Sequence, residues 1–158
     1  MMIRLCRDDE RDDILAIINA AAEAYRGVIP ADRWHEPYMP GHEFDRECLA
    51  GVVFWGYEDR GRLAGVMGLQ DVREVNLIRH AYVAPAKQRD GVGGKLLTHL
   101  LGMSTKPMLV GTWAAATKAS AASGRKPAGA GMVASAVSGG TRSGREARRA
   151  RRTFLHGG

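Results

Sequence analysis

Cysteine is scarce in this sequence, whose 158 residues include only Cys6 and Cys48. The two lie far apart and belong to no group with metal-ligand spacing, so the sequence predicts neither a disulfide framework nor a metal site. Long apolar runs are also missing, since no stretch approaches the roughly 20 residues that span a bilayer. Residues 1–5 are followed by acidic residues rather than by the apolar core of a signal peptide. We therefore expect no membrane partner and a cytoplasmic location.

Acidic residues almost disappear from the last quarter of the sequence. Residues 1–117 hold 14 Lys and Arg against 16 Asp and Glu, a formal charge of −2, whereas residues 118–158 hold 9 against 1, a charge of +8. Large apolar residues are rare in that last segment, which is rich in Ala, Gly, Ser and Arg. Such a segment buries too little apolar area to offset the entropy lost on ordering. We expect a folded domain over residues 1–117 and a weakly ordered basic tail over residues 118–158.

The first fifty residues predict one short strand and two main helices. Residues 3–6 alternate apolar and polar side chains, as a strand does, and residues 11–25 place apolar side chains at helical spacing. A shorter helix is expected over residues 42–49, with Phe44 and Leu49 on its inner side.

Three consecutive strands are expected next, at residues 52–58, 62–70 and 75–83, because β-branched and aromatic residues gather there between turn signals. An amphipathic helix begins near Val92. Residues 108–113 then read as a buried strand, which a helix-length crossover allows to run parallel to the strand before it. This order of elements argues against an alternating βαβ chain.

A glycine-rich loop joins the third of these strands to the following helix. Gly91, Gly93 and Gly94 carry no side chain that would keep a ligand away, and the start of a helix presents unpaired backbone N–H groups. These features together predict a site for an anion such as a pyrophosphate. The alternative is a plain strand-to-helix turn that binds no ligand.

Two common nucleotide-binding motifs are absent from this loop. Lys95 is followed by Leu96, where a P-loop requires Ser or Thr. Leu96 also stands where the dinucleotide-binding motif of a Rossmann fold has its third glycine. Both kinds of site are therefore disfavoured.

The same loop carries a family resemblance. Gln88-Arg89-Asp90-Gly91-Val92-Gly93 resembles the Gln/Arg-x-x-Gly-x-Gly/Ala signature of the GNAT family of N-acetyltransferases, and Tyr82-Val83-Ala84-Pro85 stands where that family ends its central strand. Strand, proline turn, glycines and Leu-rich helix also come in the required order. The resemblance implies the GNAT, or acyl-CoA N-acyltransferase, fold: a mixed α/β fold with a mostly antiparallel central sheet and flanking helices.

The resemblance also implies an activity, the transfer of an acetyl group from acetyl-CoA to a primary amine of a small molecule or of a protein N-terminus or lysine. The main chain of Tyr82 and Val83 would orient the pantetheine, with the amide of Val83 available to the thioester oxygen. The residues that it implies at the pyrophosphate are Gln88, Arg89, Asp90, Gly91, Val92, Gly93, Gly94 and Lys95.

A general base is needed because an ammonium group cannot attack a thioester. Strand alternation puts Glu74, Asn76, Ile78, His80 and Tyr82 on one face of the third strand, so Glu74 and His80 are the candidate bases.

In the family, the first two helices and the loop between them form one wall of the acceptor cleft. Trp34, His35, Tyr38 and His42 are therefore candidates for acceptor contacts. The alternative is that the aromatic residues belong to the core and the histidines to the solvated surface.

The resemblance stops near residue 117. The family continues with a helix whose Tyr often protonates the leaving thiolate, and then with two more strands, whereas no Tyr follows Tyr82 here. One hypothesis is that the residues from about 118 onward are translated out of frame. A second is that the chain is a noncatalytic acyl-CoA-binding module or an inactive, truncated relative.

A fold without its last strands would leave a sheet edge exposed, which predicts either poor solubility or a homodimer formed through that edge. The arginines of the tail could bind nucleic-acid phosphates. They lack interleaved aromatic residues, so nucleic acid is the least favoured partner.

Overall fold

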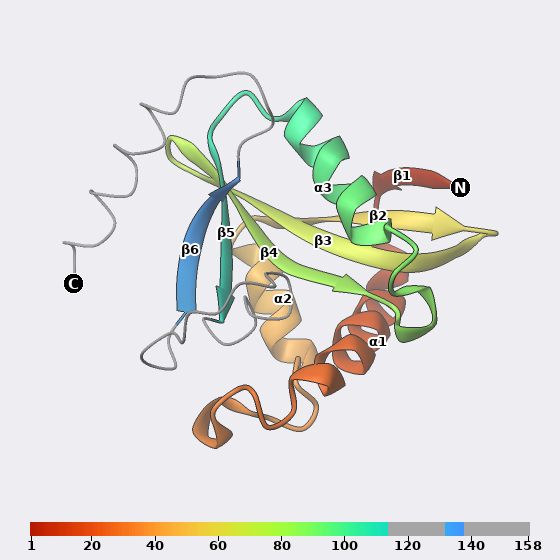
Figure 1. Ribbon diagram of the computed structural model, residues 1–158, viewed down its shortest axis with the longest axis vertical. Helices are drawn as coiled ribbons and strands as arrows, with labels where there is room; N and C mark the ends of the chain where they lie inside the picture. Colours follow the sequence, from red (N-terminus) through yellow and green to blue (C-terminus); the bar gives the residue numbers. More distant parts are fainter. Residues whose placement is uncertain (114–131, 138–158) are drawn as a thin grey trace.

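A computed structural model of the chain describes residues 1–113 and 132–137. In this part of the chain the strands form one sheet in the spatial order β1-β2-β3-β4-β5-β6 (Figure 1). Every neighbouring pair is antiparallel except β4 and β5, which run parallel. The expected mixed, mostly antiparallel sheet is thus confirmed. The strands are β1 Met2–Leu5, β2 Val52–Asp59, β3 Arg62–Val72, β4 Val75–Val83, β5 Met108–Trp113 and β6 Met132–Val137.

Among the described residues, three α-helices cover this sheet, two on one face and one on the other (Figure 1). They are α1 Arg11–Ala22, α2 Gly41–Leu49 and α3 Val92–Met103. Short 3₁₀ turns lie at Asp8–Glu10, Glu23–Tyr25, Ala31–Arg33 and Pro85–Lys87.

Each face of the sheet has its own apolar core. Ile14, Ile18 and Phe44 of α1 and α2 pack on Phe54 and Val66 of the strands. On the opposite face, the fully buried Leu96 and Leu100 of α3 pack on Ile78 and Met108. The sheet is therefore held from both sides, and β3 has a run of five buried residues, Ala64 to Gly68.

Two expectations from the sequence need correction. Leu49 was expected on the inner side of α2, but its side chain, at the last residue of the helix, is 90% exposed. The segment after residue 117 was expected to contribute no strand, but β6 pairs with β5 along its whole length. The expected sheet edge is therefore at β6 rather than at β5.

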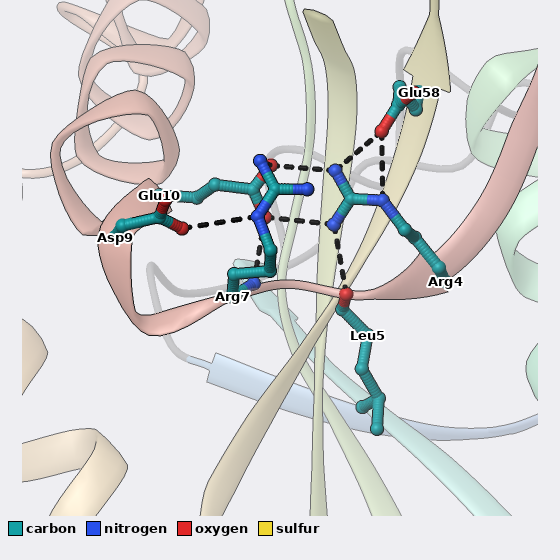
Figure 2. A network of polar contacts seen from close by, with 6 residues as sticks. All are labelled: Arg4, Leu5, Arg7, Asp9, Glu10 and Glu58. Carbon is teal, nitrogen blue, oxygen red and sulfur yellow. Dashed lines mark hydrogen bonds and ion pairs between the residues drawn. The ribbon is translucent and has the colours of Figure 1, made fainter. Parts of the chain in front are cut away.

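A charged network ties β1 to β2 and to the start of α1 (Figure 2). Arg4 donates to both carboxylate oxygens of Glu10, at 2.6 and 2.9 Å, and to Glu58 at 2.5 and 2.8 Å. The backbone N–H of Arg7 also donates to Glu10, at 2.7 Å. Glu10 is 5% exposed, and these bonds supply partners for its buried charge.

No helix in the described part of the chain is both long and apolar enough to cross a membrane. The proposed division of the chain near residue 117 remains a prediction, because most of the segment beyond it lies outside the described residues.

Candidate active site

The two parallel strands of the sheet part from each other halfway along. β4 and β5 pair only at Asn76 with Met108, Leu77 with Leu109, and Ile78 with Val110. β4 continues to Val83, and no further pair joins these two strands among the described residues. The second half of β4 therefore has a free backbone edge, to which an extended ligand can donate and accept hydrogen bonds.

A β-bulge lies in the free half of β4. Gly68 pairs with Arg79 and Val66 pairs with Tyr82, so two residues of β4, His80 and Ala81, oppose one residue of β3. His80 has a φ of 52°, in the left-handed region that non-glycine residues rarely adopt. Gly68 makes the bulge possible, since a Cβ there would lie 2.8 Å from the carbonyl oxygen of Arg79.

The bulge overturns the expected alternation along the strand. Asn76 bonds to Ser104 on the α3 side, and Ile78 packs in the α3 core. His80 stacks on Phe54, and Tyr82 packs on the α1 and α2 core. The five residues expected on one face are therefore divided between both faces, because one extra residue shifts the period of two.

The structure also separates the two candidate bases. Glu74 lies exposed in the turn that joins β3 to β4. Six residues of extended chain at about 3.3 Å each place it about 20 Å from His80. His80 lies in the bulge, three residues before the end of the strand at Val83, so of the two only His80 is near the glycine-rich loop.

The glycine-rich loop leads directly into the N-terminus of α3. Arg89 and Gly91 both have positive φ, at 73° and 74°, which turns the chain sharply into the helix. The backbone N–H of Lys95 donates to Gly91 O at 3.0 Å and is the first amide bonded inside the helix. The N–H groups of Val92, Gly93 and Gly94 precede it and have no acceptor in the helix.

The surface above these amides is open. A Cβ on Gly94 would meet nothing within 4 Å, and one on Gly93 would meet only a methyl group of Val83, at 3.6 Å. Arg89 and Asp90 are exposed, whereas Lys95 extends over the ring of Tyr57, 5.5 Å from its centroid. A free helix start with open space above it is the arrangement that binds phosphate groups.

The end of β4 directs one amide toward the free edge. The N–H of Ala84 donates to Ala64 O on β3 at 2.9 Å. Successive residues of a strand point their backbone groups to opposite edges, so the N–H of Val83 faces away from β3. The carbonyl of Val83 accepts from Gln88 Nε2 at 3.3 Å, which joins the loop to the strand. Tyr82 precedes Ala84 by two residues on the same strand, so its backbone groups also face β3.

His80 lies against a carboxylate from α2. Its Nε2 is 3.4 Å from Glu47 Oε2, and Glu47 Oε1 accepts from Arg79 at 3.0 Å. Burial lowers the pKa of His80, while the nearby Glu47 carboxylate acts in the opposite direction. The imidazole is therefore kept neutral near pH 7, as a base must be.

A cavity of about 310 Å³ opens beside Glu47, and His80 is not among the residues that line it. Glu47 and Arg79 lie in its wall, together with three further residues of α2 and its C-terminal end, Glu43, Arg46 and Ala50. The cavity is therefore polar and carries charges of both signs.

Aromatic residues of the loop between α1 and α2 reach the end of β4. Tyr38 lies 5.4 Å from Trp34 and 6.3 Å from Tyr82, measured between ring centroids. Arg26 covers the other side of Trp34, at 4.9 Å. Burial, with a smaller contribution from Tyr38, raises the pKa of Tyr82. His35 and His42, the other two candidates for acceptor contacts, are exposed.

Residues 19–122 match the family described as the acetyltransferase (GNAT) domain, over well more than half of the chain. The chain belongs to the GNAT family of acetyltransferases. No curated protein sequence matches it. The family resemblance carried by the glycine-rich loop is thus confirmed, and acetyl-CoA as the co-substrate is confirmed at the level of the family.

Several solved structures share the GNAT fold with this chain. A GNAT acetyltransferase from Brucella melitensis, in complex with acetyl-CoA, is 22% identical with a TM-score of 0.51, and the match covers 69% of this chain and 73% of that one. The PaiA N-acetyltransferase of Thermoplasma acidophilum, in complex with coenzyme A, is 14% identical with a TM-score of 0.57, covering 72% and 81%. The ribosomal-protein-S18-alanine N-acetyltransferase of Escherichia coli is 17% identical with a TM-score of 0.56, covering 75% and 70%.

Glu47 and Arg79 were missed by the sequence analysis of this GNAT domain. A signal for Glu47 was present, because it follows Phe44 by three residues and so shares the buried face of α2. Nothing in the sequence marked Arg79, since its bond to Glu47 joins residues 32 positions apart on a strand and a helix.

Proposed function

We propose that this chain transfers an acetyl group from acetyl-CoA to a primary amine. The observation that carries the proposal is the parting of β4 from β5 just before a helix whose first amides are free. A free strand edge can hold the amide groups of a pantetheine, and a helix start can hold a pyrophosphate. These two features lie at the two ends of one continuous segment, residues 79–95.

The amides of the loop would hold the pyrophosphate, and the exposed guanidinium of Arg89 would add a positive charge. Lys95, the residue that follows the free amides, would do the same by leaving the ring of Tyr57. Asp90, whose carboxylate repels phosphate, would contribute through its backbone. Gln88 would act indirectly, by fixing the loop to the strand.

The N–H of Val83 would stabilise the thioester oxygen as negative charge develops on it. Bound acetyl-CoA supplies the thioester carbonyl that the amine attacks. His80 would take a proton from the acceptor ammonium, because it is the buried, neutral imidazole of the free half of β4. Glu74 has no role in this proposal, since it lies at the far end of the strand.

The cavity beside Glu47 and Arg79 is the proposed entrance for the acceptor. It lies on the α2 side of β4, where the aromatic side chains of Tyr38 and Tyr82 also gather. The acceptor is proposed to be a small-molecule amine or a protein N-terminus or lysine.

The cytoplasmic location and the homodimer remain proposals. The free thiols of Cys6 and Cys48 support a reducing compartment. The outer edge of β6, the last strand of the described sheet, is the proposed contact between copies. The basic tail and the reading-frame hypothesis concern residues that lie mostly outside the described part of the chain.

The test is a transfer assay with the purified full chain, acetyl-CoA and a set of amines: free amino acids, a polyamine, an aminoglycoside and peptides with a free N-terminal alanine. Mass spectrometry of the amines detects a gained acetyl group. We expect at least one amine to be acetylated at a rate proportional to the protein concentration. Binding of acetyl-CoA without transfer to any amine would instead support the alternative, a noncatalytic acyl-CoA-binding module.

A further inference from the structure

Four side chains form a continuous line of polar contacts from β3 to the bulge. Arg79 donates to Gln70 at 3.2 Å and to Glu47 Oε1 at 3.0 Å. The other carboxylate oxygen, Glu47 Oε2, faces His80 Nε2 at 3.4 Å. This last separation exceeds the roughly 2.7–2.9 Å of a charge-assisted hydrogen bond. The line is thus complete except at its final contact.

The two atoms at that contact are buried and without a hydrogen bond. Both Glu47 Oε2 and His80 Nε2 are closed to solvent and have no partner among the described residues. Buried polar atoms are nearly always paired, so an exception requires an explanation. Catalytic hydrogen bonds are often long in a structure without substrate and shorten once the substrate is bound.

The position of the carboxylate selects one form of the neutral imidazole. A proton on His80 Nε2 points at Glu47 and gives both atoms a partner. A proton on Nδ1 would instead direct the lone pair of Nε2 at a carboxylate, which is repulsive. The His80 side chain is 16% exposed, and none of this exposure is at Nε2, so the ring reaches the surface through its other atoms.

We propose that Glu47 is a positioning residue for His80: it accepts the Nε2–H of the imidazole and leaves the Nδ1 lone pair free to take a proton from the acceptor ammonium. In this step an N–H bond of the ammonium breaks, an Nδ1–H bond forms, and the neutral amine keeps its electron pair for attack on the thioester. The inference rests on the proposed role of His80 as base.

The surrounding charges agree with this role. Glu47 and Glu43 of α2 favour the protonated imidazole, and Arg79 on β4 opposes it. Phe54 of β2, which stacks on the ring, adds no charge. Arg79 also holds Glu47 Oε1 by a hydrogen bond, so the carboxylate is fixed with its other oxygen toward His80.

The test is heteronuclear NMR of the histidine ring nitrogens in the full chain, with Glu47→Gln as the variant. In wild type we expect the Nε2–H form of His80. In Glu47→Gln, Arg79 can still donate to the amide oxygen of the new side chain. The amide NH₂ group then faces His80 Nε2, which must accept its hydrogen bond. The ring proton therefore moves to Nδ1, and the pKa of His80 falls because the carboxylate charge is lost.

Glu43→Gln is the matched control, since it removes the same charge from the same helix one turn earlier. It is expected to leave His80 in the Nε2–H form. An Nδ1–H form in the wild type, or an Nε2–H form that persists in Glu47→Gln, would overturn the inference. His80→Asn identifies the His80 signal in the spectrum.

This measurement uses no acetyl-CoA and no acceptor, so its result is independent of the acetyltransferase proposal. Once an acetylated amine is known, Glu47→Gln should lower kcat by about 10²-fold with KM for acetyl-CoA unchanged, as expected for impaired general base catalysis. A structural role alone would change the stability but not the tautomer.

Discussion

Two of the charged clusters in the described part of the molecule differ in one respect. In the N-terminal cluster, Arg4 and Glu10 bind each other through two hydrogen bonds, and Glu58 accepts two more (Figure 2). In the β4 cluster, Glu47 and His80 leave two buried atoms without a hydrogen bond.

We interpret the first cluster as a structural network and propose that the second is a reactive one. A network with all partners satisfied fixes a geometry and contributes to stability. A network that leaves a buried base and a buried carboxylate short of partners costs stability and is retained where chemistry needs it. Substitutions in the first cluster should therefore change unfolding, and substitutions in the second should change acetyl transfer.

The largest effect is expected from His80→Asn. Asn tolerates the left-handed backbone conformation that His80 adopts, so the bulge should persist while the base is lost. Acetyl transfer should fall by about 10²–10⁴-fold, with acetyl-CoA binding unchanged, as measured by steady-state kinetics and calorimetry.

His99→Asn is the control for His80→Asn. His99 lies on α3, near Trp55, on the other face of the sheet, and has no part in the proposed site. An equal loss of activity in both variants would mean that His80 is not the base.

A moderate effect on stability is expected from Glu10→Gln. The substitution removes the carboxylate to which Arg4 and the N–H of Arg7 donate, and Arg4 keeps Glu58 as its partner. The free energy of unfolding should fall by about 1–3 kcal/mol, as measured by urea denaturation. A fall in acetyl transfer at a temperature where the variant is fully folded would contradict the separation of the two clusters.

The smallest effect is a change in the pH dependence of stability. Hydrogen bonds from Arg4 lower the pKa of Glu10 from 4.5 to about 2. As the pH falls, the Glu10 carboxylate is therefore protonated in the unfolded state before it is protonated in the folded state. The contribution of Glu10 is complete above about pH 4.5 and is lost as the pH approaches about 2.

Urea denaturation across this pH range tests the sign. The difference in stability between wild type and Glu10→Gln should shrink as the pH falls toward 2. A difference that stays constant would mean that Glu10 is not charged through its bond to Arg4.

The glycine-rich loop made the fold predictable, because its order of strand, turn, glycines and helix is a local pattern. Glu74 shows where this approach fails. It was placed on the face of His80 by strand alternation, and a bulge of one residue removes that relation. The bulge depends on the contact of Gly68 with the backbone of Arg79, which joins residues from two strands and has no local pattern.

Glu47 is the second case. The helix that carries it was predicted, but its contact with His80 joins residues 33 positions apart, and only the packing of α2 on the sheet brings them together. Leu49, an apolar residue, was expected inside instead. Hydrophobicity correctly predicted that Phe44 lies on the buried face of α2. It did not predict that the carboxylate of Glu47 also faces inward.

The central claim is that the start of α3 binds the pyrophosphate of acetyl-CoA, and calorimetric titration of the full chain with acetyl-CoA tests it most directly. Wild type should bind with a dissociation constant of about micromolar order. Gly93→Glu should abolish binding, because its carboxylate would enter the open space above the free amides. Gly102→Glu, at the other end of the same helix and also facing open space, should bind as wild type does. Equal binding by Gly93→Glu and wild type, or no binding by wild type, would contradict the account.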